Sequence, residues 1–95
     1  MITQIFSVFD SKTGAYLKPF HESTIPSCIR SFSEACRDPE STFSKYPEDF
    51  TLFHLGHFDD QSAIFTQFDA HVALGKALDF LTPSDEPQLN LVSGE

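Results

Sequence analysis

The sequence has few of the residues that build catalytic loops. Its 95 residues include four glycines, two cysteines, one methionine and no tryptophan. The glycines are scattered through the chain, so they cannot form a glycine-rich phosphate-binding loop. None of the serines lies in a Gly-x-Ser-x-Gly nucleophile motif. The sequence therefore predicts a protein that is not an enzyme and that needs no cofactor.

Two cysteines, Cys28 and Cys36, are too few for a disulfide framework. On one helix they would lie about 12 Å apart, which is beyond the reach of a disulfide. We therefore predict reduced, half-buried thiols in a reducing compartment. The sequence also has no run of 18 apolar residues and no signal-peptide pattern at its start. These absences predict a cytoplasmic protein without membrane contact.

Basic residues are also scarce. Six Lys and Arg oppose 14 Asp and Glu, which gives a net charge of −8. A charge of this sign repels nucleic acid and anionic membranes at long range. Five of the six cations precede residue 46, however, so a locally basic region is expected within an acidic protein.

Phenylalanine is the residue in surplus, with 11 copies beside two tyrosines. Aromatic side chains bury large areas, so a few of them can fill the core of a small domain. Alternating apolar positions predict strands, and turn residues separate them; the expected strands cover residues 2–9, 15–20, 50–55 and 63–68. Asp69 as an N-cap and Pro83 as a stop predict a helix over 70–81.

The segment from Ser27 to Asp38 fits two interpretations. In one, a single helix with Pro26 in its first turn buries a stripe that includes Cys28, Phe32 and Cys36. In the other, which we favour slightly, residues 25–30 are extended, and a capping box between Ser31 and Glu34 starts a shorter helix.

The predicted fold class is therefore α+β, with a small, mainly antiparallel sheet of three to five strands and two helices. Residues 1–82 are expected to form one domain, followed by a flexible acidic tail over residues 83–95.

Aromatic residues occupy both faces of the expected hairpin between residues 50 and 68. Phe53 and Phe65 alternate with Phe50 and Phe68, so the two pairs point to opposite faces. Gly56 interrupts the first strand and predicts a bulge or a close backbone approach. A face with surplus aromatics is an interaction surface unless a helix or a partner covers it. Phe53 and Phe65 are therefore our candidates for such a surface.

Histidines and paired acids do not predict a metal site. His54 and His57 are three residues apart, so a regular strand would turn them to opposite faces. No Cys-x-x-Cys or His-Glu-x-x-His spacing is present. The acidic pairs at residues 48–49 and 59–60 are typical of solvated turns.

Several segments, in order and spacing, resemble one viral family. They are Phe6–Lys12, Ala15–Tyr16, Pro19–Phe20, Ile29–Phe32, Lys45–Phe53 and Leu55–Asp60. In these the chain resembles the small non-structural protein of gokushoviruses, which are single-stranded DNA phages of the microvirus group. The resemblance implies a DNA-binding protein that acts during viral DNA synthesis or packaging, in the cytoplasm of the infected bacterium. It implies no catalytic residue.

Two functional hypotheses follow. The first is a replication accessory protein that binds single-stranded DNA, with phosphate-contacting and stacking residues Lys12, Tyr16, Arg30, Lys45 and Tyr46. The second is a homodimeric interaction module that binds a viral replication protein, a capsid protein or a host protein without touching DNA. In the second case the acidic surface would suit a basic partner.

Overall fold

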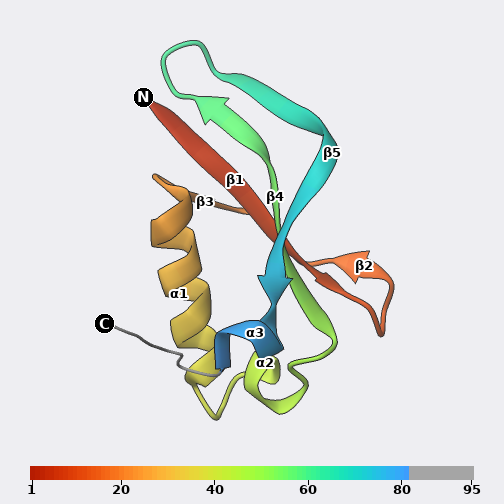
Figure 1. Ribbon diagram of the computed structural model, residues 1–95. Coiled ribbons are helices and arrows are strands. Elements are labelled where there is room, and N and C mark those ends of the chain that lie inside the picture. The colour runs from red at the N-terminus through yellow and green to blue at the C-terminus, as the bar shows by residue number, and fades with distance from the viewer. Residues whose placement is uncertain (82–95) are drawn as a thin grey trace, which may run out of the picture.

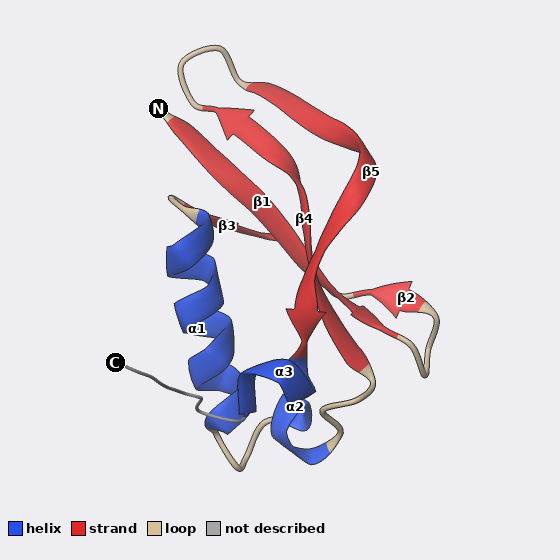
Figure 2. Ribbon diagram, in the orientation of Figure 1, coloured by secondary structure: helices blue, strands red, loops and turns tan. Residues whose placement is uncertain are grey.

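The computed structural model describes residues 1–81 as an antiparallel sheet with three helices (Figures 1 and 2). The elements in chain order are β1 (Ile2–Asp10), β2 (Ala15–Tyr16), β3 (Phe20–Glu22), α1 (Ile25–Arg37), α2 (Thr42–Lys45), β4 (Phe50–Asp59), β5 (Ile64–Lys76) and α3 (Ala77–Leu81). The α+β class and the antiparallel sheet are as predicted, but there are three helices rather than two. The predicted tail, residues 83–95, lies outside the described residues.

The sheet is built around β1 and β4. Its strand order is β2-β1-β4-β5, and β3 pairs with β1 beyond the end of β2. All pairings are antiparallel, and β5 forms one edge of the sheet. The short strands β2 and β3 share the opposite edge because the chain leaves β1 at Leu17 and returns at Phe20.

The helices lie on one face of the sheet, where the hydrophobic core forms (Figure 2). From β1 and β4 the core takes Phe6, Val8, Phe50 and Leu52, which alternate with residues on the opposite face. α1 and α3 close over them with buried side chains, namely Cys28, Phe32, Cys36 and Ala77. The ring of Phe32 contacts Phe43 of α2 and Phe80 of α3. One face of the sheet is thus covered by helices; we refer to the other as the open face.

α1 is a single helix, so the favoured interpretation of an extended segment over residues 25–30 is wrong. The helix starts earlier because Thr24 is its N-cap, with Oγ1 accepting a hydrogen bond from the backbone N–H of Ser27 at 3.1 Å. Ser31 therefore lies inside the helix and does not begin it. Spacings of four residues bring Cys28, Phe32 and Cys36 onto one buried stripe.

Both cysteines are buried on α1 and are free thiols. Burial raises the pKa of Cys28 to about 12 and that of Cys36 to about 11. Neither forms an appreciable amount of thiolate at neutral pH, so both serve as core side chains. Among the described residues, no helix combines the length and hydropathy needed to cross a membrane.

The predicted helix over residues 70–81 is wrong for its first seven residues. β5 continues to Lys76, and only Ala77–Leu81 is helical. The reason is that β4 extends back to Phe50 and offers pairing positions along its whole length, from Asp59↔Ile64 to Thr51↔Lys76. Tertiary pairing here overrides local helical periodicity. Asp79, and not Asp69, accepts the hydrogen bond that begins the helix, from the N–H of Lys76 at 2.8 Å.

Irregularities in β4 and β5 curl the sheet. The register between β1 and β4 shifts at Leu55, and the β4–β5 register shifts on both sides of His54. The prediction at Gly56 is confirmed as a close approach: a Cβ on this residue would collide with the carbonyl oxygen of Thr66 and would lie 3.0 Å from Cα of Gln67. Bulges of this kind bend a strand and increase its twist.

Candidate functional site: the open face of the sheet

The open face is defined by the strand pairings, because directly paired residues point to the same side. Ser7 pairs with Phe53, Phe9 with Thr51, and Phe58 with Phe65. The side chains assigned to this face by pairing or by ring contact are Thr3, Ile5, Ser7, Phe9, Tyr16, His21, Thr51, Phe53, Phe58, Phe65, Gln67, His71, Ala73 and Lys76. None of these carries a carboxylate. Most of these side chains are neutral or aromatic; exposed Asp69 lies on β5 between Gln67 and His71.

One aromatic cluster, the Tyr16 group, consists of Phe9, Tyr16, Phe53 and His71. The ring of Tyr16 lies 4.9 Å from Phe9, 5.7 Å from Phe53 and 5.5 Å from His71 between centroids. The hydroxyl of Tyr16 and Nδ1 of His71 are 3.2 Å apart, within hydrogen-bonding distance. Tyr16 remains 45% exposed, so its ring is available to a ligand.

A second cluster, the Phe65 group, consists of His21, Phe58 and Phe65. Phe65 lies 4.6 Å from Phe58 and 6.5 Å from His21 between ring centroids. His21 is on β3 and Phe65 is on β5, which in a flat sheet are three strand spacings, about 14 Å, apart. The short distance between their rings shows that the curl makes the open face concave.

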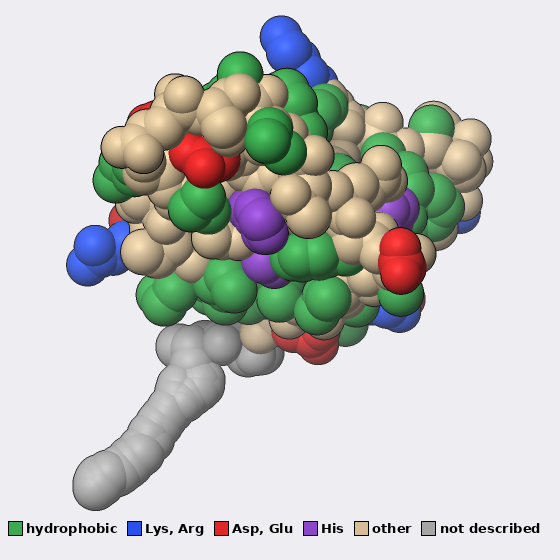
Figure 3. All heavy atoms as spheres, turned by 90° about the horizontal axis from the view of Figure 1, so that it is seen from above, with side chains coloured by type: hydrophobic (Ala, Val, Ile, Leu, Met, Phe, Trp, Pro, Cys, Tyr) green, Lys and Arg blue, Asp and Glu red, His purple; other side chains and the backbone are tan. Residues whose placement is uncertain are grey.

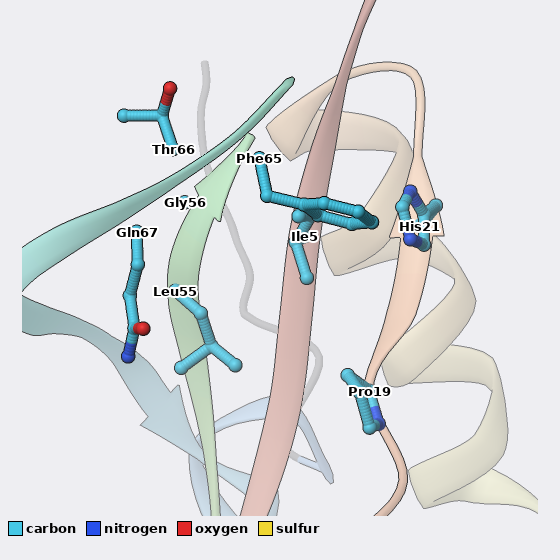
Figure 4. A pocket seen from close by; sticks show the side chains of 8 residues that line it. All are labelled: Ile5, Pro19, His21, Leu55, Gly56, Phe65, Thr66 and Gln67. Atoms are coloured by element: carbon cyan, nitrogen blue, oxygen red, sulfur yellow. The ribbon is translucent and has the colours of Figure 1, made fainter. Parts of the chain in front are cut away.

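A hollow of about 290 Å³ lies beside the Phe65 group (Figure 4). Ile5 and Leu55 line it together with Pro19, His21, Gly56, Phe65, Thr66 and Gln67. In Figure 4 the ring of Phe65 extends over Ile5 toward His21, and Gln67 lies on the other side near Leu55. The hollow therefore has aromatic and aliphatic walls with one side-chain amide at its edge.

Seen from above the molecule of Figure 1, hydrophobic and histidine side chains lie together in the middle of the surface, and Lys, Arg, Asp and Glu side chains lie around them (Figure 3). Buried Ser7 does not interrupt the apolar character, because its hydroxyl donates to the carbonyl oxygen of Leu17 at 2.5 Å.

The five residues predicted to bind nucleic acid do not form one surface. Lys12 and Tyr46 meet in a depression at the α2 end of the sheet, which they share with Asp10 and Asp49. Lys45, the last residue of α2, directly precedes Tyr46. Arg30 is exposed on α1, and only Tyr16 lies on the open face. The two predicted interaction residues, Phe53 and Phe65, are both on the open face, in separate clusters.

Sequence reasoning missed His71 and Lys76 as members of this face. Both lie in the segment that was predicted to be helical, and a helix would have turned them away from each other. The pairing of Lys76 with Thr51 instead puts Lys76 on the open face, in the same cross-strand row as Phe9 of the Tyr16 group, since Thr51 also pairs with Phe9. A strand interpretation would have placed His71 on this face but not Lys76, because the register shift between Leu52 and Phe53 reverses the alternation before Lys76.

His54 and His57 lie on the same side of β4, contrary to prediction. The extra residue at Leu55 reverses the alternation, so both imidazoles contact Phe68, at centroid distances of 4.8 Å and 6.1 Å. His54 is buried, with Nε2 2.8 Å from Oε1 of Gln4, and Nδ1 of His57 is buried without a partner among the described residues. Within residues 1–81, no three His, Cys, Asp or Glu side chains gather as a metal site.

Lowering the pH from 7.5 to 5.5 is expected to destabilise the protein through His54. Burial and the nearby His57 lower the pKa of His54, and a backbone hydrogen bond with Gly56 offsets this in part. The unfolded chain then binds a proton on His54 near pH 6.5 while the folded chain does not, so stability is lost as the pH falls from there toward the folded pKa. Urea unfolding at both pH values measures this loss.

The matched comparison for this test is His54→Gln against His71→Gln, since His71 is exposed. We expect the pH dependence to shrink in the first variant and to persist in the second. The N-terminal amine, whose pKa is raised, and Asp59, whose pKa is lowered, titrate outside this pH range. An unchanged pH dependence in His54→Gln would contradict the assignment.

The comparison with known proteins identifies one family. A family model described as Phage ORF5 protein matches residues 3–80, which include every strand except the first residue of β1. No curated protein and no solved structure matches the chain. The matched range covers both aromatic clusters and the hollow between the strands. The chain is therefore a phage protein and belongs to the Phage ORF5 protein family.

Proposed function

We propose that this phage protein is a non-enzymatic, non-structural accessory protein of viral DNA synthesis or packaging, acting in the cytoplasm of the infected bacterium. In this proposal it binds single-stranded DNA on the open face of its sheet. The observation that carries the proposal is a concave face with two aromatic clusters, on a protein whose net charge is −8. The resemblance to gokushovirus non-structural proteins supports the same reading.

The spacing of side chains along the open face suits an extended single strand of DNA. Residues two apart on a β-strand are separated by about 7 Å, about twice the 3.4 Å rise of stacked bases along one duplex strand. Ile5, Ser7 and Phe9 follow each other at this interval along β1, from the hollow to the Tyr16 group. Ser7 is itself buried, so an unstacked strand that runs along β1 would stack its bases on the aromatic clusters near the two ends of this row, which requires no particular sequence.

Contacts with DNA phosphates contribute little to the affinity in this arrangement. Lys76 lies in the same cross-strand row as Phe9 of the Tyr16 group, and Lys12 lies in the turn that joins β1 to β2. Each phosphate contact adds about −0.7 to the slope of log affinity against log salt, so a few contacts give a slope of about −2. Binding on this face is expected to depend on stacking more than on charge.

Replacing Tyr16 with alanine is expected to weaken DNA binding, because it removes an exposed ring from the centre of the Tyr16 group. One stacked base is worth about 1–3 kcal/mol, which corresponds to an affinity loss of about 5-fold to 150-fold. Fluorescence anisotropy of a labelled oligonucleotide in about 50 mM salt measures it.

Tyr46→Ala is the matched control, since Tyr46 is 59% exposed but lies in the depression shared with Asp10 and Asp49. We expect its affinity to stay within about twofold of the wild type. Wild-type protein that binds no oligonucleotide at high micromolar concentration would disprove the function. Equal losses of DNA affinity in the two tyrosine variants would indicate that the binding site is not on the open face.

The alternative function, a homodimeric interaction module, is favoured by the free edge of the sheet. β5 is 13 residues long and, within residues 1–81, pairs only with β4; its exposed side chains include Ile64, Phe65 and Val72. An uncovered edge of this length can pair with a second copy or with a viral replication or capsid protein. Light scattering at about 100 µM tests self-association, and a monomer would remove the dimer from consideration.

A further inference from the structure

We propose that the hollow beside the Phe65 group is a slot for one nucleobase and that Gln67 reads the edge of that base. This inference rests on the proposed function and adds base selectivity to it. The curl of the sheet builds the slot, because it brings Phe65 of β5 to within 6.5 Å of His21 of β3 across the intervening strands. The result is a wall of two rings over a floor of Ile5 and Leu55 (Figure 4).

The size of the slot fits a small planar group. At about 290 Å³ it is just smaller than most ligand pockets, whose volumes are about 300–1,000 Å³. Phe65 is 66% exposed, so its ring can stack on an incoming ring without first leaving a packed core. The lining includes no acidic side chain, so an electron-rich base meets no charge repulsion inside it.

The amide of Gln67 distinguishes a nucleobase from an apolar side chain. An aliphatic group in the slot would bury this amide without a matching partner, which is costly. The structure gives the amide one weak neighbour, with Nε2 of Gln67 3.4 Å from Nε2 of His71. A glutamine amide offers one donor and one acceptor side by side, the pattern that pairs with N7 and the N6 amino group of adenine. Adenine is the base we expect, because it offers an adjacent acceptor and donor on both its Watson–Crick edge (N1 and N6) and its Hoogsteen edge (N7 and N6).

The surface next to the slot can bind the neighbouring bases of the DNA strand. Gln67 contacts His71, and His71 belongs to the Tyr16 group, so the slot and the stacking cluster adjoin each other on the open face. A strand that stacks on Tyr16 can thus place a neighbouring base in the slot.

The test uses the full chain and labelled oligonucleotides of adenosine, cytidine or thymidine alone, each about ten nucleotides long. We expect the wild type to bind the adenosine oligonucleotide at least fivefold more tightly than the thymidine one, as one bidentate amide–base contact allows. Gln67→Leu keeps the approximate shape of the side chain and removes its amide. The affinities of this variant for the adenosine and thymidine oligonucleotides should therefore differ by no more than about twofold. Phe65→Ala should weaken binding of all three oligonucleotides by about fivefold or more.

Ile64→Ala is the control, because Ile64 is as exposed as Phe65 and adjacent to it but points to the other face. The affinity and the base preference of this variant should both stay within about twofold of the wild-type values. Binding that Phe65→Ala and Gln67→Leu do not change would overturn the slot while the Tyr16 platform stands. Absence of binding to any oligonucleotide would overturn both proposals. A dimer that Phe65→Ala dissociates would assign the hollow to a second copy of the chain.

Discussion

The Gly56→Ala variant is expected to lose about 3 kcal/mol of folding free energy or more. A Cβ at this position would collide with the carbonyl oxygen of Thr66, which is backbone and cannot rotate away as a side chain could. Overpacking in well-packed regions costs about 1–3 kcal/mol, and the cost is at the upper end where backbone must move. Relief would require β5 to separate from β4 at its bulge. Urea unfolding followed by circular dichroism measures the effect.

Gly14→Ala is the matched control for the same substitution. Gly14 has a φ of +72°, but a Cβ there meets no atom within 4 Å. Its cost should therefore be the left-handed backbone penalty alone, about 1–2 kcal/mol. Comparable losses in the two variants would show that β5 does not press against Gly56, and would contradict the curl that shapes the open face.

The Phe6→Ala variant is expected to be largely unfolded. Phe6 is fully buried between the sheet and the helices, with its ring 4.9 Å from His54 and 5.9 Å from Phe20. Truncation of a core phenylalanine to alanine costs about 3–5 kcal/mol. A domain of this length has a total stability of only about 4–12 kcal/mol, from about 0.05–0.15 kcal/mol per residue. The loss of near-ultraviolet circular dichroism and of cooperative thermal unfolding would report the collapse of the core.

Phe65→Ala provides the comparison for this prediction, since it removes the same side chain from a residue on the open face. Exposed substitutions usually change stability by no more than about 0.5 kcal/mol. A Phe65→Ala variant as unstable as Phe6→Ala would mean that the open face is a second core. A stable Phe65→Ala variant also makes its DNA-binding measurement a test of the site and not of folding.

Local sequence patterns predicted the elements that are regular. β1 and the first half of β4, as far as His54, alternate between the two faces, and the turn after Asp59 has the expected polar residues. The segment 70–81 failed because its apolar spacing also fits a helix, and only the pairing with β4 decides between the two. The segment 25–30 failed for a related reason: Ser31 and Glu34 form a plausible cap, but Thr24 caps the helix about two turns earlier.

The candidate site was predictable only in part. The faces of Phe53 and Phe65 followed from alternation, because Phe53 pairs regularly with β1 and Phe65 pairs regularly with the end of β4. The position of His57 did not, since one extra residue at Leu55 reverses every side chain beyond it. The hollow was also beyond prediction, because it depends on the curl that brings β3 and β5 together.

The pairing of β1 with β4 sets an order of events during synthesis. Ile2 pairs with Asp59, so β1 leaves the ribosome well before its central partner exists. At about 5–20 residues per second, that gap lasts roughly 3–10 seconds. In this interval β2 and β3 are the available partners, because they follow β1 directly and pair along the edge opposite to β4. These two short strands can therefore shield one side of a nascent apolar strand from other chains until β4 arrives.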